Sequence, residues 1–175
     1  MYSAQQVASF ILGVCNIQGV EINNLRLQYL LYIAQTGFLA KAHRQLFEDD
    51  IVAFPMGPQV REVYFEYCIY GSANINTSKF LTDQSGISIR DQNIIYQCIV
   101  PYLTMKMRQL YDMIRAPGRP WSKVFCKESP GKVIPVYLLQ DIRQCPNCGN
   151  AEHLPRAKYC MLCGAALPMN AETEN

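Results

Sequence analysis

The stretch from Asn24 to Ala40 constrains the fold more than any other part of the chain. Its apolar residues recur at intervals of three and four, which is the spacing of one face of an α-helix. Gln28 and Gln35, seven residues apart, are expected to form a narrow solvent-exposed stripe on a helix that is otherwise almost entirely apolar. Such a helix must be covered on most sides, and it is too short and too interrupted to cross a bilayer. We therefore expect a central buried helix with its neighbours around it. Its main stripe consists of Leu27, Leu30, Leu31, Ala34 and Phe38.

The segments on either side of this helix carry their own signals. A first helix, with Ser3 as its N-cap, has apolar residues at helical spacing and is expected to end near Gly19. After the central helix, two short apolar runs at residues 46–47 and 51–54 flank an acidic turn, which indicates a small β-hairpin.

The rest of the main domain is expected to consist of short helices separated by proline and glycine breaks. The first of these helices runs from Pro58 to Gly71 and is followed by a loop over 72–86. The next helix begins at Ser88 or Asp91 and ends or kinks at Pro101, and another is capped by Thr104. A break at 116–120 precedes Trp121, and a last helix covers about 135–143.

The eight cysteines divide by context. Four are scattered, and most of these stand among apolar residues, where a free thiol packs as a small hydrophobe. The other four form two C-x-x-C pairs separated by eleven residues, each followed by glycine. A two-residue gap lets both sulfurs of a turn reach one ion, and four thiolates suit tetrahedral zinc. We predict one structural Zn²⁺ held by Cys145, Cys148, Cys160 and Cys163.

Disulfides and an empty thiol cluster are the alternatives to this metal site. No basic segment followed by a long apolar run opens the chain, so we expect a cytoplasmic protein, and a reducing compartment favours metal over disulfides. His153 lies between the pairs and is an alternative ligand, although a surface position suits it better. Because protein fills all four positions, none is left for a catalytic water.

These signals define the expected architecture. Half of the residues are hydrophobic, which is enough for a sizeable core. The fold class expected is mainly α (α+β), a compact helical domain around the central helix with a small β-hairpin. We place this domain at residues 1–140, the zinc ribbon at 141–168 and a flexible tail at 169–175.

The net charge and the lack of recognisable catalytic motifs limit the classes of function that we expect. The formal net charge of +2 gives no global case for nucleic acid or an anionic membrane. Basic residues do outnumber acids between residues 106 and 132, which suits either an acidic partner, nucleic acid or ordinary solvated helix faces. The chain has two histidines, no recognisable nucleophile motif and no glycine-rich phosphate loop, so we expect no enzymatic activity.

Residues 1–140 carry an ordered set of short motifs. They are Val7-Ala8, Phe10-Ile11, Leu27, Leu30-Leu31-Tyr32, Ala34-Gln35, Leu46-Phe47, Ile51, Ala53-Phe54, Gly57-Pro58, Val63-Tyr64 and Pro120-Trp121. In this order the motifs resemble the Panacea domain, also called the SocA-like antitoxin domain, of bacteria and their phages. The chain departs from the family where Arg26 and Tyr29 replace common lysines.

The resemblance implies a mostly helical protein that neutralises a toxin by direct binding, and one relative acts as an adaptor that delivers its toxin to a protease. Many members belong to prophages or mobile elements. We take the turn at Met56, Gly57 and Pro58 as the candidate partner-binding residues, with a structural turn as the alternative. The other functions considered are a zinc-ribbon nucleic-acid-binding regulator and a phage protein that binds a host factor. The partner and the oligomeric state are left open.

Overall fold

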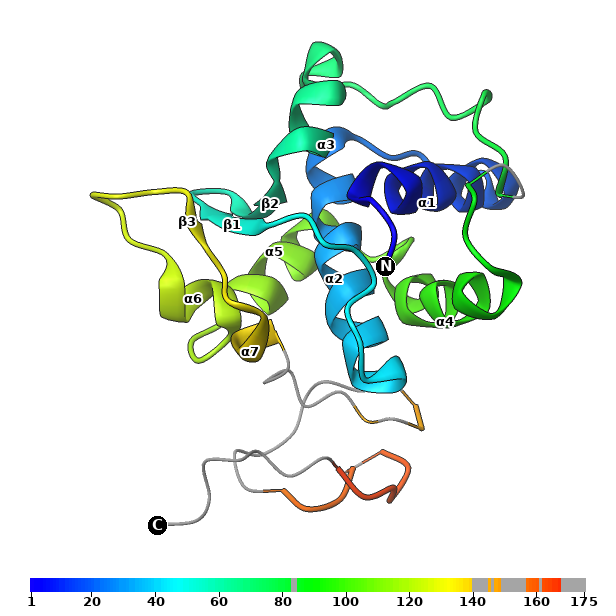
Figure 1. Ribbon diagram of the computed structural model, residues 1–175. Helices are drawn as coiled ribbons and strands as arrows, with labels where there is room; N and C mark the ends of the chain where they lie inside the picture. Colours follow the sequence, from blue (N-terminus) through cyan, green and yellow to red (C-terminus); the bar gives the residue numbers. More distant parts are fainter. Residues whose placement is uncertain (83–84, 140–144, 146, 149–156, 161, 168–175) are drawn as a thin grey trace.

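The computed structural model describes residues 1–82, 85–139, 145, 147–148, 157–160 and 162–167. Within this range the chain forms a mainly helical domain with a small antiparallel sheet, as expected, followed by the cysteine-bearing segment (Figure 1). No helix of the described residues has the length and hydropathy to span a membrane.

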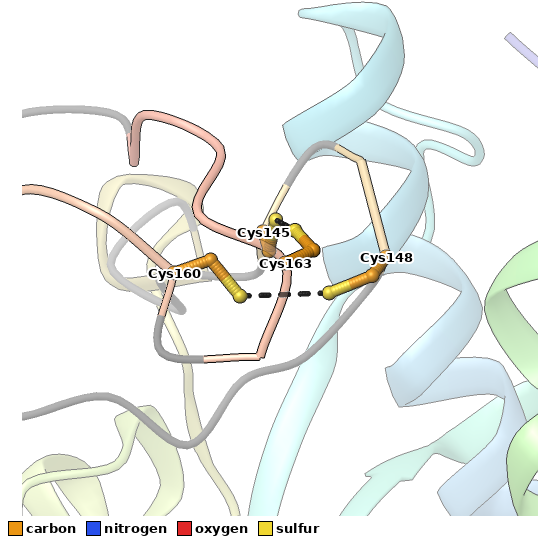
Figure 2. Close-up of side chains that lie close together, drawn as sticks. All are labelled: Cys145, Cys148, Cys160 and Cys163. Atoms are coloured by element: carbon orange, nitrogen blue, oxygen red, sulfur yellow. Dashed lines mark hydrogen bonds between the residues drawn. The ribbon is translucent and has the colours of Figure 1, made fainter.

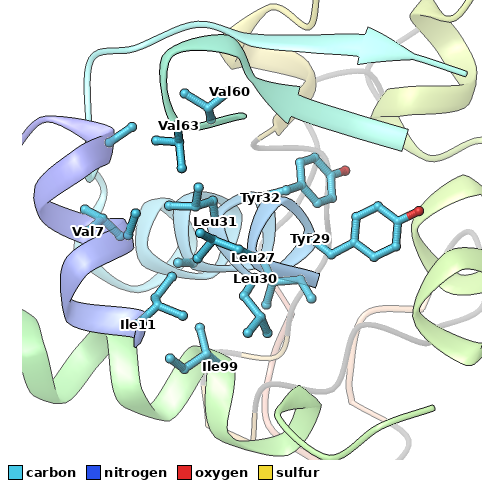
Figure 3. Packing of buried hydrophobic residues seen from close by; sticks show 14 of the residues in the cluster. Val7, Ile11, Leu27, Tyr29, Leu30, Leu31, Tyr32, Val60, Val63 and Ile99 are labelled. Carbon is cyan, nitrogen blue, oxygen red and sulfur yellow. The ribbon is translucent and has the colours of Figure 1, made fainter. Parts of the chain in front are cut away.

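Helix α2 (Asn24–Ala42) is the centre of the fold, as the sequence predicts. Its N-cap is Asn23, whose side chain accepts a hydrogen bond from the backbone N–H of Arg26, and every residue from 27 to 39 is buried. Helix α1 (Ala4–Gln18) and helix α4 (Ile89–Ile99) lie on one side of α2 (Figure 1). Figure 3 shows how residues of α1, α4 and the sheet region close around α2. The labelled residues are Val7, Ile11, Leu27, Tyr29, Leu30, Leu31, Tyr32, Val60, Val63 and Ile99.

The prediction that Gln28 and Gln35 form a solvent-exposed stripe on α2 is wrong, because both side chains are buried. The Gln35 side-chain oxygen accepts hydrogen bonds from the N–H groups of Leu46 and Phe47, at 3.0 and 3.1 Å, and its amide nitrogen donates to the Phe47 carbonyl. Gln28 likewise accepts from the N–H of Val60 at 2.8 Å. The two amides therefore satisfy backbone groups that would otherwise be buried without a partner.

The hairpin forms with a different partner from the one expected. Strand β1 (Ile51–Phe54) pairs with β2 (Gly57–Val60) and, on its other side, with β3 (Lys132–Val133), in the order β2-β1-β3. Residues 46–47 do not form the second strand, since Gln35 occupies their N–H groups. Pro58 does not open a helix either, because it lies opposite Ala53 in β2. As β2 is an edge strand, a residue without an N–H is tolerated there.

The remaining helices are shorter than the sequence predicts. Helix α3 (Arg61–Glu66) gives way to the 3₁₀ turn η1 (Cys68–Tyr70) before Gly71. A 3₁₀ turn, η3 (Val100–Tyr102), follows α4. Lys106, and not Thr104, is the N-cap of the next helix. The later helices are α5 (Met107–Arg115), α6 (Pro120–Val124) and α7 (Val136–Leu139), of which α6 was not expected. Residues 140–143 of the expected last helix lie outside the described residues.

The cysteine-bearing segment has a small apolar cluster of its own. Cys145, Cys160 and Leu167 are its buried members, and they do not belong to the main core. A bridge between Tyr159 and Ala166 closes the turn that carries the second cysteine pair. The expected boundary near residue 140 falls outside the described residues.

Candidate metal centre and exposed surfaces

The four paired cysteines lie close together in space. The Sγ atoms of Cys145, Cys148, Cys160 and Cys163 are all within 4.8 Å of one another. Figure 2 shows the four side chains converging, with Cys145 next to Cys163 and Cys148 next to Cys160, at Sγ–Sγ distances of 3.4 and 3.5 Å. Each close pair joins one C-x-x-C turn to the other, so an ion between them would link the two turns.

These distances fit a tetrahedral metal ion. Four sulfurs placed about 2.3 Å from a central ion lie about 3.8 Å from one another, within the range seen here. A disulfide needs an S–S distance of about 2.05 Å, and all eight cysteines are free in this structure. The geometry therefore favours a metal site over disulfides.

Backbone hydrogen bonds hold the turn that carries the second cysteine pair, Cys160 and Cys163, and some of them point at a sulfur. The Cys160 N–H donates to the Ala165 carbonyl at 2.7 Å, and the Gly164 N–H donates to the Cys160 carbonyl at 2.9 Å. Gly164 has φ +72°, a conformation that favours glycine. The turn also lets the Leu162 N–H point at the Cys160 sulfur, 3.4 Å away. Such N–H groups stabilise a thiolate.

The charge state of these thiols is consistent with metal binding. The N–H of Ala165 is the largest cause that lowers the pKa of Cys163, to about 6, followed by hydrogen bonds from Asn147 and Cys145. Desolvation raises the pKa of Cys160, but the N–H groups of Cys163 and Leu162 outweigh it and lower the value overall. Because the thiolate is the form that binds metal, the pKa of Cys163 favours metal binding near neutral pH, and the lowered pKa of Cys160 acts in the same direction.

The partner-binding turn predicted at Met56, Gly57 and Pro58 joins β1 to β2. Met56 is 49% exposed, whereas Gly57 and Pro58 are buried, so only Met56 presents a side chain at the surface. The turn is held from beneath, since the Tyr29 hydroxyl donates to the Met56 carbonyl. The Trp121 indole N–H donates to the Phe54 carbonyl at 2.9 Å and fixes the end of β1.

A second exposed apolar surface was not recognised in the sequence. Helix α3 and turn η1 project from the top of the domain in Figure 1 and carry Tyr64, Phe65 and Ile69, which we call the α3–η1 patch. Phe65 is 67% exposed and Ile69 is 87% exposed, and the Tyr64 and Phe65 rings meet edge to face at 5.7 Å. The signal was the run from 63 to 70, whose apolar residues occupy more than one helical face and cannot all be buried.

Of the two histidines, one lies within the described residues. His43 is the C-cap of α2, with φ +54°, and its backbone N–H donates to the Leu39 carbonyl. This is a structural position. His153, the alternative metal ligand, lies outside the described residues, as does Gly149.

Comparisons with protein-family models, with curated proteins and with solved structures find no match for this chain.

Proposed function

We propose that the four-cysteine site holds one structural Zn²⁺ ion. The support is the donor set, since four thiolates at tetrahedral separations suit zinc and leave no position open for a substrate or a water. Among the described residues of this segment, the apolar cluster has three buried members, which is too few to stabilise a fold alone. Structural zinc contributes about 10–16 kcal/mol in comparable peptides, so the metal would supply most of the stability of the ribbon.

The function that we infer for the helical domain is that of an antitoxin-like protein, which neutralises a toxin by binding it directly in the cytoplasm and catalyses no reaction itself. The α3–η1 patch carries this proposal. Contiguous exposed aromatic and aliphatic side chains mark protein interaction sites, and aromatic residues are enriched in the cores of such sites. The ordered resemblance to the Panacea domain supplies the class of partner.

The proposal is tested with the product of the open reading frame adjacent to this one. Expressed alone from an inducible promoter, that product should arrest growth, and expression of the present chain should restore growth and yield a complex that co-purifies. Phe65→Ser combined with Ile69→Ser should abolish both effects. Ile89→Ser is the matched control, because Ile89 is 77% exposed on α4, away from the patch.

Three outcomes contradict the proposal. The first is a neighbouring product that is harmless and forms no complex. The second is rescue that survives the double substitution in the patch. The third is salt-sensitive binding of the chain to DNA without a protein partner, which would favour the nucleic-acid alternative, because phosphate contacts release counterions. A harmless neighbour that nonetheless co-purifies would favour a protein-binding role of another kind, such as capture of a host factor.

A further inference from the structure

Arg115, the last residue of α5, is held between two aromatic rings. Its guanidinium carbon lies 4.2 Å from the ring centroid of Tyr111 and 4.2 Å from that of Trp121. Trp121 is itself fixed by its hydrogen bond to the Phe54 carbonyl and by stacking on Phe125, with ring centroids 4.5 Å apart. The arginine therefore has little rotamer freedom left to lose when it binds a ligand.

The charge of Arg115 is not neutralised by the described residues. The ion pairs found among these residues are Arg44 with Asp91 and Arg108 with Asp112, and neither involves Arg115. The Nε atom of Arg115 is buried and has no hydrogen-bond partner among the residues that the structure describes, while the residue as a whole is only partly buried. A partly desolvated guanidinium without an anion is costly, so the site is suited to a ligand that supplies one.

A second buried donor, on α2, also lacks a partner. The hydroxyl of Tyr32, whose side chain is almost fully buried, has no hydrogen-bond partner within the described part of the chain. Burial raises the pKa of both the Tyr29 and the Tyr32 hydroxyl, and the charges of Arg115, for Tyr29, and of Arg119, for Tyr32, oppose that rise. The rings of Tyr29 and Tyr32 leave α2 on the same side (Figure 3). Tyr29 also supports the Met56 turn, while Arg115 with its ring neighbours Tyr111 and Trp121 forms what we call the Arg115 cluster.

The surface around this cluster is basic. Helices α5 and α6 and strand β3 lie on the side of α2 away from α1 and α4 (Figure 1). The acids of this segment are engaged, because Asp112 pairs with Arg108 and Glu128 accepts a hydrogen bond from Cys126. The exposed basic side chains here are Lys106, Arg108, Lys123, Lys127 and Lys132.

We propose that Arg115 is the anchor for an acidic segment of a protein partner, and that it receives an Asp or Glu carboxylate of that segment. This rests on the proposed function and names the chemistry of the partner. Because two rings lie 4.2 Å from the guanidinium carbon and Nε is buried, the two terminal Nη groups are the part left to receive a planar carboxylate. Trp121 already stacks on Arg115 and Phe125, so it does not offer the free aromatic face with which single-stranded nucleic acid is bound.

The single tryptophan makes the test direct, because its fluorescence reports on the group stacked against it. The full-length protein is titrated at low salt with a hexaglutamate peptide. We expect a saturable change in Trp121 fluorescence. The apparent Kd should rise at least tenfold in Arg115→Gln and also in Arg115→Lys, which keeps the charge but lacks the planar fork. Arg108→Gln, on the same helix and with the same change of charge, should stay within about twofold of the wild type. Far-ultraviolet circular dichroism checks that each variant is folded.

Inorganic phosphate and an oligothymidylate serve as the other arms. Weaker binding of both than of hexaglutamate supports the proposal. Tighter oligothymidylate binding, equal losses in Arg115→Gln and Arg108→Gln, or no response to hexaglutamate would each overturn it. The proposed function fails separately, because it depends on the α3–η1 patch. If substitutions in the patch abolish rescue from the toxin but Arg115→Gln leaves hexaglutamate binding unchanged, the proposed function holds and the role of Arg115 as an anchor is wrong.

Discussion

At the scale of single residues, the least expected feature is the environment of Asp91. The sequence marks this residue only as one possible start of α4, but its carboxylate is buried and joins three parts of the chain. It accepts from the Tyr2 hydroxyl at 2.7 Å and pairs with Arg44 at 2.6 Å, and its backbone N–H donates to Ser88. No periodicity reveals such a network, because its members are up to 89 residues apart.

The pKa of Asp91 gives this network a pH dependence. Desolvation raises the pKa, but hydrogen bonds from Tyr2 and Arg44, and the Arg44 charge, lower it below the usual value of 3.8. A lowered pKa in the folded protein means that the stabilisation is present above the unfolded pKa and is lost as the pH falls through the folded pKa.

We therefore expect Asp91→Asn to lower the free energy of unfolding by about 1–3 kcal/mol at pH 7, and by less near pH 3. Denaturant titrations of both proteins at the two pH values measure this. Asp112→Asn is the control, since its pair with Arg108 is exposed and should be worth about 0.5 kcal/mol or less. An Asp91→Asn loss that is the same at both pH values would argue against the network.

At the scale of elements, the helices α1, α2 and α4 are predictable because their caps and apolar spacing are local. The sheet is harder to predict from the sequence, because the pairing of its strands depends on groups that are distant in sequence. Gln35 on α2 takes the N–H groups that the expected strand needed. Strand β3 lies at residues 132–133, where the sequence predicts no helix or strand. The β1–β2 turn depends on a contact with Tyr29 that the sequence also hides.

That contact makes Gly57 the residue on which the turn depends most. Its φ is +131°, and a Cβ there would stand 2.7 Å from Cε1 of Tyr29. Gly57→Ala should cost more than about 1 kcal/mol of unfolding free energy, since it adds a steric clash to an unfavourable backbone angle. Gly118→Ala separates the two effects, because Gly118 also has positive φ, but a Cβ added there would meet no atom of the described residues within 4 Å. Thermal unfolding of the two variants should rank Gly57→Ala as clearly the less stable; equal losses would exclude the clash.

At the scale of the whole molecule, the chain combines a large helical core with a small cysteine cluster. The sequence predicts well that the four paired cysteines lie close together, because the spacing within each C-x-x-C pair is a local property. It predicts the surfaces poorly. Whether Met56, Phe65 or Arg115 lies exposed depends on how elements pack, and the α3–η1 patch and the Arg115 cluster appear only in three dimensions.

The central claim is that the cysteines form a structural zinc site on a helical domain that is stable without it. Elemental analysis of protein purified under reducing conditions, without chelator, tests this most directly when run on the wild type and Cys148→Ser together. We predict about one zinc per wild-type chain, little in the variant, and nearly unchanged helical circular dichroism in both. Iron in place of zinc, a metal content near zero in the wild type, or a variant that loses its helical signal would contradict the account.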